Sequence, residues 1–235
     1  MGTNHKDVVY ILKNDIQPEE LRYSLRSVGQ NFPHGKVWFF GGCPKGITPD
    51  VYVEYRQQGR TKWEKATSTY RAICNTEEVS EDFWLFNDDF YILKKVNDLP
   101  MMYRGTLAER VKDLVDKHGA ITPYCFQLIK TEEALSAKNL DTLDYAIHTP
   151  MLINKKKALE TLDAFPTCPM FRSLYGNYTE AGGIQTDDVK IYDTFTLPKE
   201  GQTLLSTSDT SFRAGQVGKY IRDRFTEPSR WETSC

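Results

Sequence analysis

The chain has 235 residues, of which 40% are hydrophobic and 12% aromatic, and its 30 basic and 32 acidic side chains leave a net charge of −2. This composition suits a packed α/β domain and excludes a disordered protein. The length fits one domain over residues 1–235. The balanced charge excludes a global field that would attract a polyanion, although a local basic face is compatible with it.

Cysteine usage and hydropathy bear on the compartment. The cysteines are widely spaced and form no C-x-x-C pair, so a structural zinc site is not expected. No signal peptide of useful length and no run of roughly 20 apolar residues is present. The sequence therefore predicts a cytoplasmic protein without a membrane span, with free thiols at Cys43, Cys74, Cys125, Cys168 and Cys235.

The first part of the chain alternates strand and helix patterns. The β-branched run 7–12 predicts a buried strand, and segment 18–28 begins with Pro-Glu-Glu and continues at helical spacing. Segments 36–42 and 51–56 predict two further strands. This order indicates a mostly parallel, Rossmann-type sheet flanked by helices.

The remaining elements continue this alternation with one interruption. Residues 61–79 predict a helix, followed by a strand at the start of "DFWLFNDD". Residues 104–147 differ in character and indicate a helical excursion, with helices at 107–119 and 131–143, that could serve as a lid over an acceptor. A strand, a turn and a helix are expected within 147–166.

Two adjacent carboxylates, Asp88 and Asp89, follow a nearly continuous apolar strand. Ligands in open α/β sheets gather at the carboxyl ends of strands. The pair could hold a divalent cation that bridges a nucleotide diphosphate. The alternative is a strand-end turn with solvated carboxylates.

A second acidic pair and a histidine are further candidates. Asp187 or Asp188 could be the general base for an acceptor hydroxyl, or both could complement a helix capped by Thr186. His148 is flanked by apolar residues and could bind a metal or touch a phosphate, or it could be a half-buried histidine with partners inside the protein.

Several basic side chains could bind an anion. Arg22 and Arg26 share a helix face and could bind phosphate or pair with neighbouring glutamates. Arg172 in "FRSLYGN" could clamp an oxyanion or form a buried salt bridge. The C-terminal cations could contact a polyanion or form a solvated basic face; they are Arg213, Lys219, Arg222 and Arg224.

These segments together resemble a known group of proteins. "DVVYIL", "ELRYSLRSV", "KVWFFGG" and "SEDFWLFNDDFYIL" resemble the conserved blocks of the stealth-type sugar-phosphate transferases. They resemble more closely the compact phage-encoded GT-A-like glycosyltransferases related to them. "HTPMLINKK" and "FRSLYGN" resemble later blocks, so the resemblance is scattered over residues 7–190.

The resemblance implies a nucleotide-sugar-binding α/β fold of the GT-A kind. In that fold an acidic motif at a strand end holds Mn²⁺ or Mg²⁺ with the donor diphosphate. Asp88 and Asp89 match the motif, although the spacing is D-D after Asn87 rather than D-x-D. This departure leaves open which carboxylate touches the metal.

The resulting expectation is a metal-dependent glycosyltransferase. A nucleotide-sugar donor, with a UDP-sugar favoured, would be bound by Tyr10, Arg22, Arg26, Asp88 and Arg172. Asp89, Asp88 and His148 would hold the metal, and Asp187 or Asp188 would be the base if the reaction inverts the anomeric centre.

The acceptor and two alternative functions remain open at this point. The acceptor is expected to be either a hydroxylated pyrimidine base of phage DNA, modified in the host cytoplasm, or a glycan. The alternatives are a stealth-type sugar-1-phosphate transferase, which releases a nucleoside monophosphate, and a nucleotide-sugar-binding module without turnover.

Overall fold

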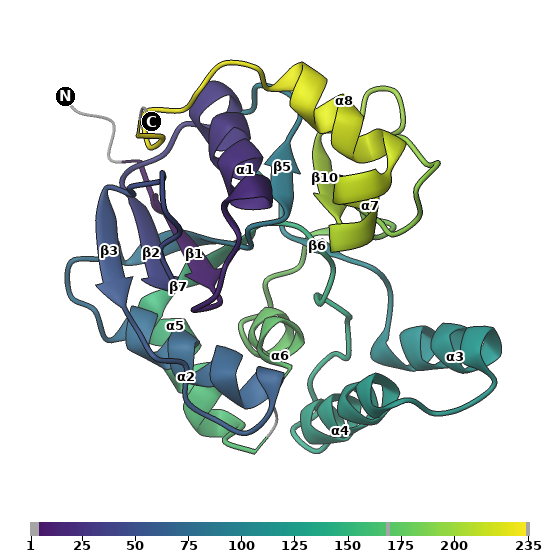
Figure 1. Cartoon of the computed structure of the whole chain (residues 1–235). Helices are drawn as coiled ribbons and strands as arrows, with labels where there is room; N and C mark the ends of the chain where they lie inside the picture. The colour runs from purple at the N-terminus through teal and green to yellow at the C-terminus, as the bar shows by residue number, and fades with distance from the viewer. Residues whose placement is uncertain (1–4, 168–169, 234–235) are drawn as a thin grey trace.

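The computed structural model describes residues 5–167 and 170–233, and its centre is a five-stranded sheet (Figure 1). The strand order is β3-β2-β1-β4-β7. The four strands β1 to β4 are parallel, and β7 runs antiparallel to β4 at one edge. The α/β prediction is therefore confirmed. The strands span Asp7–Leu12 (β1), Val37–Gly41 (β2), Val51–Glu54 (β3), Asp82–Phe86 (β4) and Met151–Asn154 (β7).

Helices cover both faces of this sheet because the strand residues alternate between two apolar cores. Val8, Tyr10 and Leu12 of β1 pack in the core formed with α1. Val9 packs in the opposite core, together with residues of α2, α5 and α6. The sheet is thus buried on both sides, as parallel sheets usually are. The helices span Pro18–Asn31 (α1), Lys62–Cys74 (α2), Lys155–Ala164 (α5) and Phe171–Tyr178 (α6).

A small second sheet continues from the end of β4. Its order is β5-β10-β9, and two short helices, α7 and α8, share an apolar core with it. A further pair of strands, β6 and β8, links the segments around residues 102 and 184. These strands have two to four residues, too few for a recognisable sequence pattern. The elements span Phe90–Ile92 (β5), Met102–Tyr103 (β6), Ile184–Gln185 (β8), Lys190–Ile191 (β9), Leu204–Thr207 (β10), Asp209–Ala214 (α7) and Gln216–Arg224 (α8).

The predicted helical excursion contains two helices that pack together beside α6, α3 (Leu107–His118) and α4 (Pro123–Ser136) (Figure 1). The predicted start of α4 at residue 131 is wrong. The helix begins at Pro123 because Thr122 caps it by accepting a hydrogen bond from the backbone of Cys125. The helix predicted over 61–79 likewise ends at Cys74, where Asn75 is its C-cap.

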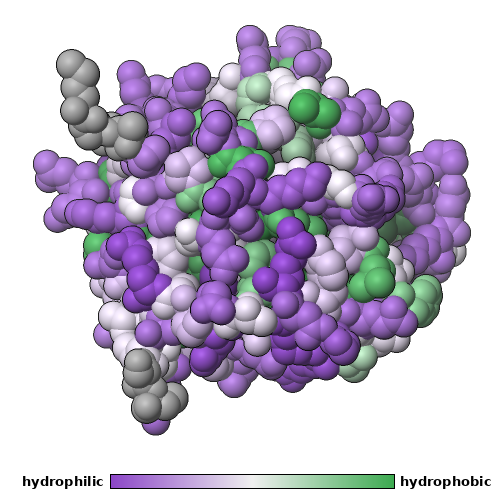
Figure 2. All heavy atoms as spheres, turned by 90° about the horizontal axis from the view of Figure 1, so that it is seen from above, coloured by the Kyte–Doolittle hydropathy of each residue, from purple (hydrophilic) through white to green (hydrophobic). Residues whose placement is uncertain are grey.

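Hydrophilic side chains cover most of the face seen in Figure 2, with hydrophobic residues only in scattered spots. Within the described part of the chain, no helix is long and apolar enough to cross a membrane. Cys43, Cys74 and Cys125 are free thiols, whereas Cys168 and Cys235 lie outside the described residues.

The C-terminal segment is fastened to α1 by an ion-pair network. Glu232 accepts hydrogen bonds from Arg26 at 2.7 and 2.8 Å and from Arg22 at 3.1 Å. Both arginines were expected to bind donor phosphate or to pair with Glu19 and Glu20. The structure gives them this different partner, and neither lines the three cavities described below.

Glu232→Gln should lower the free energy of unfolding at pH 7 by about 1–3 kcal/mol, because it removes charge-assisted hydrogen bonds. Burial acts to raise the pKa of Glu232, but bonds from Arg26 and Ser229 outweigh it, and the pKa lies below 4.5. The ionised carboxylate therefore stabilises the fold above that value, and the contribution is lost as the pH falls through the lower folded pKa.

Urea unfolding of both proteins between pH 3 and 7 measures this difference. The exposed Glu78→Gln variant is the control and should match the parent protein. A wild-type advantage that persists unchanged at the acid end would contradict the assignment.

Candidate functional site

The strand order reverses between β1 and β4, and a crevice at their carboxyl ends follows from this topology. Lys13 follows β1, and Asp88 and Asp89 form the turn between β4 and β5. A cavity of about 470 Å³, here called the switch-point cavity, lies at this edge and is lined by Lys13, Asp88 and Glu20. Asp209 and Arg213 of α7 also line it. Asp88, which the sequence predicted to be a site residue, thus lines a cavity.

Negative charge is concentrated in the switch-point cavity. Burial, followed by repulsion from Asp89, raises the pKa of Asp88 to about 6. Burial also raises the pKa of Glu20 to about 7, with further contributions from the charges of Asp88, Asp89 and Asp209. Ionisation of these two carboxylates therefore costs free energy, and a bound cation would offset this cost.

The donor set fits a cation bound jointly with a ligand. Within residues 5–167 and 170–233, no group of three or more His, Cys, Asp or Glu side chains is arranged to hold a metal ion. Mg²⁺ commonly binds through one or two carboxylates together with substrate phosphates and water. Asp88 has no ion-pair partner in the described part of the chain, so its carboxylate is available for such a role.

Asp89 is held differently from Asp88. Its Oδ2 accepts a hydrogen bond from Lys190 Nζ at 2.7 Å and another from Ser206 Oγ at 3.0 Å. Register explains this contact, because Ser206 of β10 pairs with Phe90 on one side and with Lys190 on the other. Asp89 is therefore held by residues of the second sheet. Asp88, which has no such partners among the described residues, is the carboxylate that is better placed to contact a ligand.

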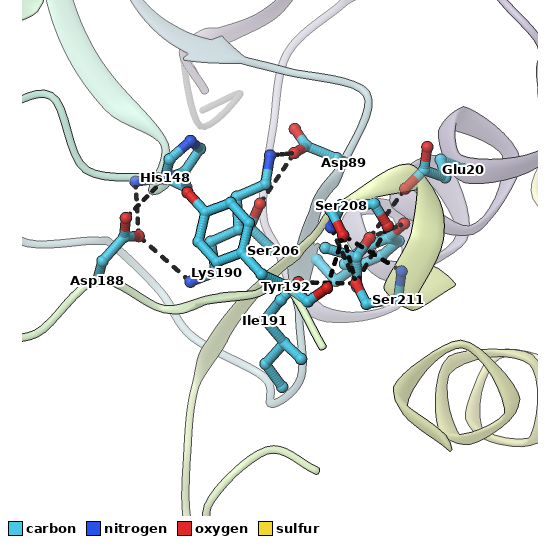
Figure 3. Close-up of polar contacts among 12 residues, drawn as sticks. Glu20, Asp89, His148, Asp188, Lys190, Ile191, Tyr192, Ser206, Ser208 and Ser211 are labelled. Carbon is cyan, nitrogen blue, oxygen red and sulfur yellow. Dashed lines mark hydrogen bonds and ion pairs between the residues drawn. The ribbon is translucent and has the colours of Figure 1, made fainter. Parts of the chain in front are cut away.

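Lys190 also reaches the second acidic pair (Figure 3). Its backbone N–H donates to Asp188 Oδ1 at 3.2 Å. Asp188 Oδ2 lies 2.8 Å from His148 Nδ1, and Asp188 Oδ1 accepts from the backbone N–H of His148 at 3.2 Å. His148 reaches this edge because it precedes Met151, which pairs with Leu85 near the end of β4.

The contact between Asp188 and His148 fixes which ring nitrogen of His148 carries a hydrogen. Burial acts to raise the pKa of Asp188, but hydrogen bonds from the ring and backbone of His148 and from the backbone of Lys190 lower it below its usual value. An ionised carboxylate only accepts, so Nδ1 of His148 carries the hydrogen. In the neutral ring, Nε2 is then the nitrogen that can accept a proton.

Asp187 does not belong to this arrangement. Its side chain is 89% exposed, and its ion-pair partner, Lys199, lies 3.9 Å away. Asp187 lines neither the switch-point cavity nor the cavity beside His148. The prediction that Asp187 could be the base therefore has no support in the geometry.

His148 and Asp188 line a cavity of about 340 Å³, here called the dyad cavity. Arg172 on α6 lines it too and donates a hydrogen bond to the carbonyl of Thr149. Its Nε is buried and has no partner, and its guanidinium lies 5.8 Å from the centre of the Phe90 ring. No carboxylate in the described chain pairs with Arg172, so the buried salt bridge is not formed. The aromatic walls are Trp63, Tyr70, Tyr124, Phe171 and Tyr192.

A third cavity of about 510 Å³, the basic cavity, adjoins both others. It is lined by the cations Lys13, Arg56, Lys62 and Lys65. It shares Lys13 with the switch-point cavity and Lys62 with the dyad cavity. The three cavities therefore adjoin one another along the carboxyl edge of the sheet, with the basic cavity between the other two.

Tyr10 is the clearest correction among the predicted donor-binding residues. Its side chain is completely buried, and its hydroxyl is hydrogen-bonded to Ser24 Oγ at 2.9 Å. Tyr10 supports α1 from the core and cannot reach a ligand. Sequence reasoning also missed Lys13, Glu20 and Lys190. Lys13 could have been predicted as a site residue because it directly follows β1, whereas the roles of Glu20 and Lys190 are visible only in the folded structure.

Comparisons with known proteins add little to this geometry. No family model matches the chain, and no curated protein matches it. A solved structure with some similarity is the glycosyltransferase GlyE of Streptococcus pneumoniae TIGR4, with 9% sequence identity and a TM-score of 0.37. The alignment covers 95% of this chain, which spans 50% of the length of that protein.

Glu20→Gln should stabilise the protein at pH 8 by about 1 kcal/mol after allowance for solvent screening, and should have little effect at pH 4. The folded pKa of about 7 exceeds the ordinary value of 4.5, so folding takes up a proton between these values. Stability from the protonated form is present below pH 4.5 and lost as the pH rises through 7. Glutamine keeps the oxygen that accepts from Thr207.

Urea unfolding at pH 4, 6 and 8 tests this expectation. Glu78→Gln, at an exposed position that does not line the cavity, is the control and should change stability by less than about 0.5 kcal/mol at each pH. A Glu20→Gln protein that is less stable than its parent at pH 8 would show that the cavity does not concentrate negative charge.

Proposed function

We propose that the protein is a metal-dependent glycosyltransferase that uses a nucleotide-sugar donor. The observation that carries the proposal is the placement of Asp88 and Lys13 at the ends of β4 and β1, where the strand order reverses. Nucleotides bind at this place in open α/β sheets. The adjoining basic cavity supports the binding of a diphosphate, because its four cations would offset the negative charge of the phosphate oxygens.

The donor would lie across the switch-point and basic cavities. Lys13 lines both and is placed to contact the diphosphate, with Arg56 and Lys65 farther along. Asp88 would hold Mn²⁺ or Mg²⁺ together with phosphate oxygens. When bound, the cation offsets the negative charge that develops on the leaving nucleoside diphosphate. Asp89, held by Lys190 and Ser206, keeps the turn that carries Asp88 in place.

The acceptor would enter the dyad cavity, where His148 is the general base. The acceptor oxygen attacks the anomeric carbon, the bond from that carbon to the diphosphate breaks, and Nε2 of His148 takes the acceptor proton. Asp188 accepts from Nδ1–H, which fixes the ring and stabilises the positive charge that it acquires. Direct displacement with such a base inverts the anomeric centre. This assignment replaces His148 as a metal ligand and Asp188 as the base itself.

Arg172 completes the proposed site between the dyad and the donor. Arg172 lines the dyad cavity, and its guanidinium would donate to an oxygen of the donor phosphate or of the acceptor, because its buried Nε has no partner within the described part of the protein. A UDP-sugar remains the favoured donor by resemblance. The expected acceptors are a hydroxylated pyrimidine base and a glycan. The aromatic walls of the cavity are compatible with both, because a base or a sugar ring can pack against them.

Donor binding tests the proposal. A nucleotide sugar at 100 times its Kd, with Mn²⁺ present, should raise the melting temperature by about 5 °C or more. Asp88→Asn should remove the metal-dependent part of the shift, whereas the exposed Asp187→Asn should keep it. Failure of every nucleotide sugar to bind would contradict the proposal.

The products separate the proposed reaction from its alternatives. Release of a nucleoside diphosphate on turnover supports glycosyl transfer. Release of a nucleoside monophosphate would instead support sugar-1-phosphate transfer. Donor binding without any release, in the presence of acceptors that carry hydroxyl groups, would indicate a binding module.

His148→Asn should lower turnover by about 10²–10⁴-fold, because it removes the general base. Donor affinity should be unchanged, because His148 does not line the switch-point cavity. Asparagine retains an N–H that can donate to Asp188, so the fold should be preserved. His118→Asn on the exposed side of α3 is the matched control. Turnover within a factor of three of the parent protein would rule out His148 as the base.

A further inference from the structure

Cations from three separate parts of the chain line the dyad cavity. Lys62 lies on α2, Arg104 follows β6, and Arg110 lies on α3. None of the three forms an ion pair with a carboxylate in the described part of the chain. By contrast, Arg22, Arg26, Arg71, Arg222 and Arg230 all have carboxylate partners.

The carboxylates in the same cavity are already engaged. Asp144 accepts hydrogen bonds from the backbone of Ala146 and from Ser173, and Asp188 is bound by His148. Arg172 adds a fourth cation, with a buried Nε that has no partner. The cavity is therefore locally positive in a chain whose net charge is −2.

The size of the cavity and its lining residues limit the chemical class of ligand that it can bind. Unpaired arginine forks match phosphate oxygens, and the aromatic rings of Trp63, Tyr124 and Tyr192 offer faces for a cyclic body. A volume of about 340 Å³ accepts a small cyclic molecule. A nucleic-acid duplex is too wide to enter a cavity of this size.

We propose that the acceptor is a cyclic molecule that carries a phosphate monoester, with the phosphate bound by Arg104 and Arg110 and the reacting hydroxyl beside His148. This inference rests on the proposed function and deepens it, because it names the chemical class of the acceptor. The phosphate is a binding handle and is unchanged by the reaction. A sugar phosphate and a nucleoside monophosphate share this chemistry.

Calorimetric titration of the full chain with two matched pairs of probes tests the inference. Glucose 6-phosphate is compared with glucose, and deoxycytidine 5′-monophosphate with deoxycytidine. At least one phosphorylated probe should bind at least tenfold more tightly than its neutral counterpart, and the better probe identifies the sugar or the nucleotide source. Equal affinities within both pairs, or no binding of either phosphate, would overturn the proposal.

Variants locate the binding. Arg104→Gln and Arg110→Gln should each weaken the better probe by about tenfold or more, the loss expected for one charge-assisted contact. Both side chains are partly exposed, so the fold should survive, and the melting temperature checks this. Lys117→Gln removes an exposed cation from the same helix, α3, and should leave affinity unchanged. Retained affinity in both arginine variants would contradict the assignment.

Saturating nucleotide sugar with Mn²⁺ separates this inference from the proposed function. The phosphorylated probe should still bind, because donor and acceptor occupy neighbouring cavities. Competition between them would place the donor in the dyad cavity and overturn the inference. If the protein binds the phosphorylated probe but shows no donor binding that depends on Asp88, the proposed function alone is contradicted.

Discussion

Lys190 is the residue that connects the two halves of the candidate site, through its side chain and through its backbone. Its ammonium binds Asp89, and its backbone N–H binds Asp188, which in turn holds His148. The ammonium and the Asp89 carboxylate are largely buried, with side-chain exposures of 16% and 13%. Breaking a buried ion pair by removing one partner typically costs about 3–5 kcal/mol, because it leaves an uncompensated charge. The geometry of both acidic pairs therefore depends on the second sheet, which places Lys190 between them.

This constraint divides the edge of the main sheet into parts with different chemistry. The switch-point cavity is acidic, with Asp88 and Glu20 at raised pKa values, and the basic cavity beside it carries Lys13 and Arg56. The dyad cavity combines one oriented histidine with unpaired arginines. The proposed cation site, anion site and base thus follow one another along adjoining cavities, an order that suits transfer from a charged donor to an acceptor.

Local sequence patterns predicted the central sheet and the position of Asp88, because a long apolar run followed by carboxylates reports both a strand and its end. The same patterns could not separate Asp187 from Asp188, since only the contact with His148 distinguishes them. Strands β9 and β10 are too short to be recognised, so the partners of Asp89 were hidden. Tyr10 was assigned to the donor although alternation along β1 places it in the core with Val8 and Leu12. Arg26 was misassigned because its partner, Glu232, lies at the other end of the chain.

The most direct measurement of the central claim is a crystal structure with Mn²⁺ and the nucleoside diphosphate of the bound donor, recorded with anomalous data at the manganese edge. The proposed function predicts one anomalous peak beside the Asp88 carboxylate, with diphosphate oxygens completing its ligands and Lys13 close to the same phosphates. The diphosphate should extend into the basic cavity and leave His148 free. A manganese peak away from Asp88, or a nucleotide bound elsewhere than at the ends of β1 and β4, would contradict it.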